Sequence, residues 1–378
     1  MAKRRGANEG SIYQRKDGLW TAAVNLGYAG GGKRQRRTLY GRTRHAVARK
    51  LTDALKARQD GLPLPREREV VGPFLCQWLE SVKPSLRPRT WARYESLIRI
   101  HALPEIGRLP LGKLGPAHLQ RLYASRLEAG QSPASVRQLH AVLHRSLRQA
   151  FRWGLVGRNV ADLVTPPRVE RHRVQALSPE QSRALLEAAR GDRLEALYVV
   201  ALSTGMRLGE LLALGWADID LDAGALQVRG TLQRTRGSTV IVEPKTARSR
   251  RRIELTGLAT EALRRHRVAQ AEERLRLGPA WQNLDLVFAN EVGSYLSETI
   301  LRRKSFWPLL ERAGLARIRF HDLRHTAATL LLGRGVHPKI VSEALGHSTV
   351  AITLDLYSHV TPTMQRESAS AMDAVLRG

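Results

Sequence analysis

The first 60 residues alternate short runs of β-forming side chains with turn residues. Strands are predicted at residues 11–15, 19–27 and 33–40, with the turn Lys16-Asp17-Gly18 after the first and three glycines after the second. A helix is predicted from about residue 43 to residue 59. This part of the chain should therefore form a small three-stranded sheet followed by one helix.

Residues 72–160 have a different pattern, in which apolar residues recur three and four positions apart. That spacing predicts an all-helical segment. The apolar positions are Phe74, Leu75, Trp78, Leu79, Leu119, Leu122, Tyr123, Val136, Leu139, Val142, Leu143, Leu147 and Phe151.

Two proline-containing segments divide the chain. Residues 62–65 alternate Leu and Pro and predict one linker, and Pro166, Pro167 and the charged run after them predict another. A new domain should open at Ser178, because Pro at the first helical position and Gln181 at the third make a favourable helix start. We therefore expect an α+β multidomain chain. Residues 1–62 would form a small three-stranded sheet plus helix, residues 66–165 a helical domain, and residues 174–378 a mainly helical domain with a short antiparallel sheet.

The positive charge of the chain is extreme and unevenly distributed. The formal net charge is +28; residues 1–60 hold 15 Lys and Arg against 4 Asp and Glu, and residues 61–168 hold 17 against 7. The first 168 residues thus carry 21 of the 28 excess charges. A polyanion such as DNA is the natural partner. A generally basic protein is the alternative, but a bias of composition alone would not favour the front half.

Candidate DNA-contacting side chains lie in both front domains. The predicted strand at residues 33–40 is strongly basic and would line a ribbon with cations that can enter a major groove, although a solvated charged strand is the alternative. Other arginines interrupt the apolar stripes of the helical segment. The candidates are Arg34, Arg36, Arg37, Arg89, Arg93, Arg137 and Arg145.

Cysteine usage and hydropathy set the expected compartment. Cys76 is the only cysteine, which excludes an internal disulfide and a cysteine-based zinc site. The basic start is followed by no apolar signal region, and no apolar run approaches the roughly 18 residues that span a bilayer. We expect a soluble cytoplasmic protein, associated with a bacterial nucleoid.

Metal, nucleotide and serine-hydrolase chemistry have little support in the sequence. Asp218, Asp220 and Asp222 superficially suggest a cation loop, but the Gly and the distant Glu of a calcium-binding hand are lacking. These three residues are expected to cap a turn between a helix and a strand. The sequence contains no Walker-type glycine loop and no Gly-x-Ser-x-Gly elbow.

The informative segment of the chain runs from Phe320 to Thr326. On a helix, His321 and Arg324 share one face, so their side chains could reach a single phosphate together. The pair alone is not specific, because an Arg-rich chain produces such pairs by chance. His118 with Arg121 is a second one.

Four further motifs surround this segment. They are an Arg after a Thr-Gly pair, a Lys between two strand-like runs, a Leu-Gly-His triplet, and a Tyr near the end. In sequence numbers these are Thr204-Gly205-Met206-Arg207 with Glu210, Lys245 between residues 239–243 and 252–255, Leu345-Gly346-His347, and Tyr357.

These motifs, in this order over residues 177–360, resemble the tyrosine recombinase (phage integrase) family, whose signature is T-G-x-R-x-x-E, a Lys on a β-hairpin, H-x-L-R-H, L-G-H and a terminal Tyr. The resemblance implies a site-specific recombinase that cleaves and rejoins DNA through a 3′-phosphotyrosine, without metal, ATP or other cofactor, to integrate or excise a mobile element or phage. The helical segment is similar to the family's SAM-like core-binding domain. The small basic domain, on pattern rather than motif, is similar to its arm-type DNA-binding domain. The implied active site is Arg207, Lys245, His321, Arg324, His347 and the nucleophile Tyr357.

The resemblance also implies partners. These are double-stranded DNA with core-type and arm-type sites, and further copies of the chain in a homo-tetramer that holds two duplexes. It leaves room for an accessory excisionase or DNA-bending protein.

The chemistry of these residue types agrees with the resemblance. A tyrosine hydroxyl with a pKa near 10 needs a base or electropositive surroundings to attack a phosphate. Two guanidiniums match two non-bridging phosphate oxygens, which favours Arg207 and Arg324. His321 would accept or share the tyrosine proton, and His347 would hydrogen-bond the phosphate. Lys245 would protonate the departing 5′-oxygen, which a guanidinium effectively cannot do.

Two alternatives stay open at this point. A type IB topoisomerase would share this chemistry, but the extra basic N-terminal domain favours a recombinase with two kinds of DNA site. A non-catalytic DNA-binding regulator on the same fold would be favoured by loss of a catalytic residue, and none is lost. Only Tyr295 competes with Tyr357 in the last 180 residues, and it precedes the later motifs. Glu210 is interpreted as structural support for the Arg207 loop.

Overall fold

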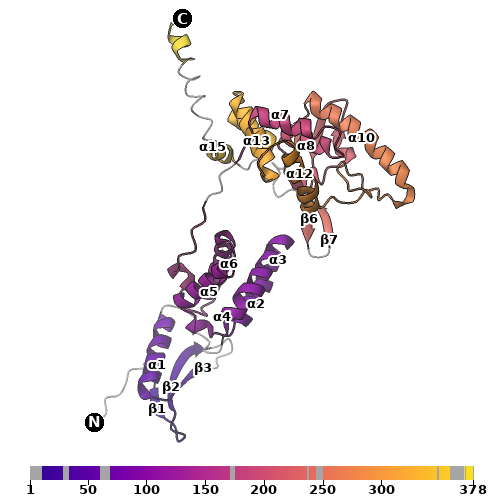
Figure 1. Cartoon of the computed structure of the whole chain (residues 1–378). Helices are drawn as coiled ribbons and strands as arrows, with labels where there is room; N and C mark the ends of the chain where they lie inside the picture. Colours follow the sequence, from indigo (N-terminus) through magenta and orange to yellow (C-terminus); the bar gives the residue numbers. More distant parts are fainter. Residues whose placement is uncertain are drawn as a thin grey trace. The chain divides into compact units, whose positions relative to one another are not determined.

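The computed structural model describes residues 11–28, 34–59, 69–170, 175–235, 238–243, 250–346, 349–357, 370 and 372–377. The chain divides into two compact units, Met1–Arg171 and His172–Gly378 (Figure 1). Within the described ranges, no helix combines the length and the apolar character needed to cross a membrane.

The first unit opens with the predicted three-stranded sheet. Strands β1 (Ser11–Gln14), β2 (Trp20–Tyr28) and β3 (Arg34–Gly41) pair antiparallel in the order β1-β2-β3. Helix α1 (Arg44–Gln59) follows and packs on one face of the sheet. Because side chains alternate across a strand, the buried residues of β2 and β3 on this face meet those of α1. They are Ala22, Val24, Leu39, Val47, Leu51 and Ala54.

The rest of the first unit is helical, as predicted. Its helices are α2 (Val71–Val82), α3 (Pro88–Leu97), α4 (Leu103–Ile106), α5 (Pro116–Glu128) and α6 (Pro133–Arg152), and a π-helical turn, Ile98–Ala102, joins α3 to α4. Proline at a first helical position starts α3, α5 and α6. The predicted apolar stripes form one core, separate from that of the sheet. Phe151 is an exception at 39% exposed, since it lies in the last turn of α6.

The second unit is mainly helical. It starts with α7 (Pro179–Ala188), α8 (Glu195–Thr204) and α9 (Leu208–Leu211), and α10 (Gly257–Leu277) follows the strands. After these come α11 (Glu298–Ile300), a π-helical segment Leu301–Phe306, α12 (Trp307–Arg312), α13 (His321–Gly333), α14 (Pro338–Leu345) and α15 (Val350–Tyr357). The predicted start at Ser178 is confirmed, because its side chain accepts a hydrogen bond from the backbone N of Gln181 at 3.1 Å. Helix α8 is buried along most of its length and lies at the centre of the core.

The strands of the second unit form two small antiparallel sheets. One has the order β4-β5-β8, from β4 (Ile219–Asp220), β5 (Ala225–Val228) and β8 (Arg251–Glu254), and the other pairs β6 (Thr231–Thr235) with β7 (Ser238–Val242). The strand-like runs predicted on either side of Lys245 correspond to β7 and β8, but these two strands do not pair with each other. A two-residue connection after Thr235 favours the hairpin of β6 with β7. Lys245 itself lies outside the described residues.

Candidate active site

Gly205 shapes the turn that carries Arg207. It ends α8 in the left-handed conformation with φ of 62°, and Arg207 then caps α9 with extended backbone. A Cβ at Gly205 would lie 2.4 Å from Leu345 Cδ2 of α14 and 3.3 Å from Ala327 Cβ of α13. Glycine is therefore required both for the backbone conformation and for the close packing of α13 and α14 against this turn.

Glu210 holds Arg207 from within α9. Its carboxylate accepts hydrogen bonds from Nη1 and the backbone N of Arg207, at 2.8 and 3.0 Å, and from Nη2 of Arg251 on β8, at 3.0 Å. Glu210 is only 4% exposed. Burial alone would raise the pKa of this carboxyl, but the hydrogen bond and charge of Arg251, and the contact with Arg207, lower the pKa below its usual value. The carboxylate is therefore charged at neutral pH and binds both guanidiniums.

Arg324 reaches the same turn from α13. Its side chain is buried, and its Nη1 donates a hydrogen bond to the carbonyl oxygen of Gly205 at 2.9 Å, across 119 positions of sequence. The start of α13 is fixed by Asp322, which is buried and accepts hydrogen bonds from Nε, Nη2 and the backbone N of Arg319. Arg207 and Arg324, which sequence reasoning assigned to one phosphate, thus meet at one turn.

His321 is the first residue of α13. It is exposed, while its ring packs edge-to-face against His325 with centroids 4.8 Å apart. Burial on that side, His325 and the positive charge of Arg324 lower the pKa of His321 to about 4. Burial likewise lowers the pKa of His325, although Asp322 raises it. His321 is therefore a neutral imidazole at pH 7 and can accept a proton.

Gly346 ends α14 in the left-handed conformation and directly precedes His347. Its carbonyl oxygen accepts a hydrogen bond from Arg207 Nη2 at 3.1 Å. Two residues earlier, the carbonyl oxygen of Ala344 accepts a hydrogen bond from Arg251 Nε at 2.7 Å. The two arginines that pair with Glu210 therefore also hold the end of α14.

Three of the six predicted active-site residues are described in full, namely Arg207, His321 and Arg324. Lys245 and His347 lie outside the described residues. Tyr357 is the last residue of α15, and its side chain also lies outside them.

The described part of the site suits a phosphate group. Arg207 is 39% exposed, and its guanidinium lies beside the turn that anchors the buried Arg324. Guanidinium donors stabilise oxygens that gain negative charge, and the neutral His321 can take up a proton from an attacking hydroxyl. The arrangement can therefore support transfer of a phosphoryl group.

Sequence reasoning missed Arg251. The residue lies in a run of three arginines, in which residue type alone does not distinguish an inward side chain. Along β8 burial alternates, with Arg251 and Ile253 inward and Arg252 and Glu254 outward. This two-residue period, with Ile253 marking the inner face, is the signal that could have identified Arg251.

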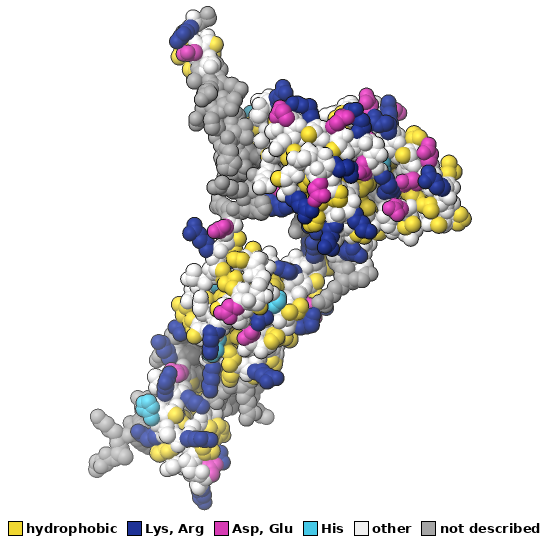
Figure 2. Space-filling model, in the orientation of Figure 1, with side chains coloured by type: hydrophobic (Ala, Val, Ile, Leu, Met, Phe, Trp, Pro, Cys, Tyr) yellow, Lys and Arg dark blue, Asp and Glu magenta, His cyan; other side chains and the backbone are white. Residues whose placement is uncertain are grey.

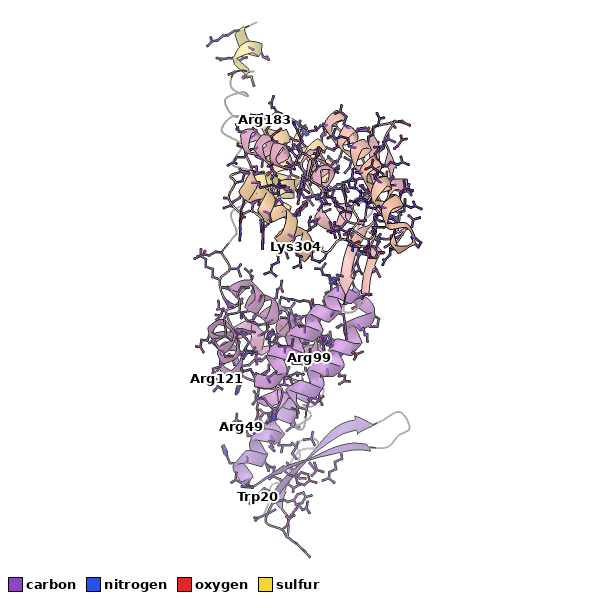
Figure 3. All side chains as sticks on the ribbon, turned by 45° about the vertical axis from the view of Figure 1, so that its right-hand side comes forward. Trp20, Arg49, Arg99, Arg121, Arg183 and Lys304 are labelled. Carbon is purple, nitrogen blue, oxygen red and sulfur yellow. The ribbon has the colours of Figure 1, made fainter. Side chains whose placement is uncertain are left out.

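Two other motifs have structural roles. His118 Nδ1 accepts a hydrogen bond from the backbone N of Gly115 at 3.0 Å and so caps α5, while Arg121 is exposed on that helix (Figure 3). The His118–Arg121 pair belongs to the first unit, whereas the residues of this site belong to the second. In the aspartate motif, Asp220 Oδ1 accepts from the backbone N of Asp222 and of Ala223, at 3.1 and 2.8 Å. Asp220 therefore caps a turn as predicted, but the turn joins strands β4 and β5 rather than a helix and a strand.

The DNA-contact candidates are exposed wherever the structure describes their side chains. The side chains of Arg34 and Arg37 lie outside the described residues. Arg36 is exposed on β3. In the helical part, the exposed candidates are Arg89 and Arg93 on α3 and Arg137 and Arg145 on α6.

Contacts between polar side chains place α3 beside α6. Arg93 donates two hydrogen bonds to Gln138 Oε1 at 3.1 and 2.7 Å. Arg145 lies over the ring of Tyr94, 6.0 Å from its centroid. The four helical candidates therefore come from two adjacent helices.

Comparison with known proteins gives consistent matches. Residues 175–364 match the Phage integrase family, and residues 71–127 match the family described as phage integrase, N-terminal SAM-like domain. An integrase from Streptomyces ambofaciens is 31% identical over 391 residues, covering 100% of this chain and 99% of that protein. A tyrosine recombinase XerC-like protein from Caldanaerobacter subterraneus subsp. tengcongensis is 29% identical over 374 residues, covering 94% of this chain and 95% of that protein.

Solved structures show the same fold. A lambda integrase tetramer bound to a Holliday junction has a TM-score of 0.57 and covers 93% of this chain and 96% of that one. Its sequence identity of 19% supports a likeness of fold alone.

Proposed function

The chain belongs to the phage integrase family of tyrosine recombinases, and on that premise we propose the residues that carry out its reaction. Members of this family are site-specific recombinases that cleave and rejoin DNA, and this chain is such an enzyme. The proposed active site consists of Arg207, Lys245, His321, Arg324, His347 and Tyr357.

The observation that carries this assignment is the hydrogen bond from Arg324 to the turn that carries Arg207. The two arginines come from motifs far apart in the chain, yet Arg324 is anchored on Gly205, two residues before Arg207. Guanidinium groups form two-pronged hydrogen bonds with phosphate oxygens, and a pair of them can bind both non-bridging oxygens of a phosphodiester. The two guanidiniums stabilise these oxygens most strongly in the transition state, where the oxygens gain negative charge.

The proposed reaction proceeds in two matched steps. Tyr357 Oη attacks the scissile phosphorus, the bond from phosphorus to the 5′-oxygen breaks, and a 3′-phosphotyrosine forms. His321 takes the tyrosine proton, His347 hydrogen-bonds the phosphate, and Lys245 gives a proton to the departing 5′-oxygen. A 5′-hydroxyl of the partner strand then attacks the phosphotyrosine and releases Tyr357. Because the phosphotyrosine conserves the energy of the phosphodiester bond, the exchange needs no ATP.

We propose that three domains serve this reaction. Residues 1–62 would bind arm-type sites, residues 66–165 would bind the core site, and residues 174–378 would carry out catalysis. Two separate hydrophobic cores within the first unit and the boundary at Arg171 support the division.

Double-stranded DNA is the proposed substrate. The exposed arginines of α3 and α6 would contact core-site phosphates, and Arg34, Arg36 and Arg37 of β3 would contact the arm site. On the second unit, Lys and Arg side chains gather around β6 and β7 (Figure 2). We further propose that the enzyme acts in the bacterial cytoplasm as a tetramer on two duplexes, with an excisionase or DNA-bending protein as accessory partner.

Replacement of the nucleophile tests the assignment. Tyr357→Phe should abolish covalent attachment to DNA and leave DNA affinity nearly unchanged, because only the attacking oxygen is removed. The assay uses a nicked suicide substrate, on which the adduct accumulates, followed by a denaturing gel. A covalent adduct formed by the variant would contradict the role of Tyr357.

A further inference from the structure

Arg251 is a buried cation that lies in the sequence between two exposed arginines. Its side chain is 7% exposed, whereas those of Arg250 and Arg252 are 54% and 60% exposed. Arg252 pairs with Glu254 on the surface, and Arg251 pairs with the buried Glu210. Desolvation of a guanidinium is expensive unless hydrogen bonds compensate it, so the inward position of Arg251 requires specific partners.

The partners of Arg251 link three segments of the second unit. Nη2 donates to Glu210 in α9, and Nε donates to the carbonyl oxygen of Ala344 near the end of α14. Gly346 packs against the same guanidinium, since a Cβ there would lie 3.0 Å from Nη1 of Arg251. Arg207 donates both to Glu210 and to the carbonyl oxygen of Gly346. Arg251, Glu210, Arg207 and the end of α14 therefore form one closed hydrogen-bond network.

From this hydrogen-bond network we propose that Arg251 is a positioning residue, which sets the orientation of the Arg207 side chain through their shared partner Glu210. Arg251 contacts one oxygen of that carboxylate, Oε2, while the Nη1 of Arg207 contacts the other, Oε1. Its bond to Ala344 fixes Arg251 relative to the end of α14, and the carboxylate between the two arginines is therefore held in one rotamer. The Arg207 guanidinium is thereby held beside Gly346, to whose carbonyl oxygen its Nη2 donates.

The inference rests on the proposed role of Arg207 at the phosphate. If Arg251 is changed, Glu210 loses the side-chain partner that ties its Oε2 to β8 and, through Ala344, to α14. The buried carboxylate is then held by Arg207 alone, through its backbone N and its Nη1, and draws that guanidinium towards itself. Arg207 would then turn away from the scissile phosphate. Small misplacements of a group that acts in the transition state lower the rate strongly, while binding of the rest of the DNA is unaffected.

Arg251→Lys in the full-length protein tests this, with Arg252→Lys on the same strand as the matched control. Lysine keeps the charge but cannot bond Glu210 and Ala344 together in the fork geometry of arginine. We expect Arg251→Lys to slow single-turnover cleavage of saturating suicide substrate by about 10-fold or more, with DNA affinity unchanged. Arg252→Lys should leave both quantities unchanged. Thermal unfolding of both variants checks that the fold is retained.

The same substitution in an Arg207→Lys background separates positioning from general support of the fold. Arg207→Lys alone should slow cleavage by about 100-fold, by analogy with loss of one oxyanion donor. Adding Arg251→Lys should then cause little further slowing, because the side chain whose orientation it controls is already gone. Equal slowing in both backgrounds, or no slowing in the wild-type background, overturns the proposal and leaves the active-site assignment intact. Wild-type cleavage by Arg207→Lys itself would instead overturn the active-site assignment, and this inference with it.

Discussion

Arg324 donates a hydrogen bond from Nη1 to the carbonyl oxygen of Gly205 at 2.9 Å. This bond ties α13 to the turn that carries Arg207. Because Gly205 has φ of 62° and lies against Leu345, its backbone determines where both proposed phosphate-binding arginines are held. Changes in the turn should therefore affect both stability and cleavage.

Gly205→Ala is expected to reduce stability and cleavage more than the same substitution at another glycine with left-handed backbone conformation. Gly224 has the same φ of 62°, but a Cβ there has no atom within 4 Å. Gly224→Ala should lower the free energy of unfolding by about 1–2 kcal/mol, the usual penalty of this conformation. Gly205→Ala should lower it by about 1–3 kcal/mol more, because Leu345 is fully buried and has little room to move.

Denaturant unfolding and single-turnover cleavage measure the two effects of these substitutions. Gly205→Ala should also slow cleavage, because the added methyl group would push the turn that carries Arg207 away from Leu345 of α14. Gly224→Ala should leave the cleavage rate unchanged. Equal behaviour of the two variants would show that the contact with Leu345 does not constrain the turn.

The pKa of His321 predicts how stability depends on pH. A histidine whose pKa is about 4 in the folded protein and about 6.5 in the unfolded chain binds a proton more readily when unfolded. The unfolded state is therefore favoured increasingly as the pH falls from about 6.5 towards 4, and this effect is absent above that window. His325, with its pKa shifted in the same direction, adds to the loss.

His321→Gln should reduce this pH dependence, because the amide does not titrate. Between about pH 7 and about pH 5, the wild-type protein should lose more unfolding free energy than the variant. Urea unfolding of both proteins at the two pH values is the measurement. An identical loss in both would mean that His321 keeps its usual pKa in the folded protein.

Lys245 was assigned from the sequence alone, and its role as proton donor can be tested chemically. Lys245→Ala should cleave ordinary DNA slowly, and a substrate with sulfur in place of the bridging 5′-oxygen should restore the rate. A thiolate leaves without a general acid, so the missing proton donor no longer matters. If the variant is equally slow on the sulfur substrate, another residue protonates the leaving group.

Removal of residues 1–62 should separate the two kinds of DNA binding. The sheet and α1 have their own hydrophobic core, distinct from that of the helices after it. The truncated protein should cleave a minimal core site at a nearly unchanged rate and bind a longer site with flanking arm sequences more weakly. The full-length protein should also show the steeper salt dependence, because each neutralised phosphate contributes about 0.9 to the slope of log K against log salt.

Gel-shift affinities of both proteins at several salt concentrations measure this difference. The minimal core site serves as the matched control, because it offers no arm sequence to the deleted domain. The same affinity and the same slope on the long site would mean that residues 1–62 do not bind arm sequences.

Local features of this protein followed from its sequence. The spacing of apolar residues predicted the helices of the first unit, and Ser178 with Gln181 predicted the start of α7, because such signals act within one or two helical turns. His321 and Arg324 are three residues apart on α13, as their spacing required. The types and order of the proposed active-site residues are likewise properties of the sequence.

Tertiary packing alone decided how these pieces meet. The sequence does not reveal that the buried Arg251 bonds Glu210, nor that β8 pairs with β5 while β7 pairs with β6. The hydrogen bond from Arg324 to Gly205 joins residues 119 positions apart. The hydrogen-bond network through Glu210 and Arg251 joins α9, β8 and α14. Such contacts form because a buried polar group is stable only when it is hydrogen-bonded, and its partner comes from whichever segment is packed beside it in the folded chain. A local run of residues does not determine which segment that is.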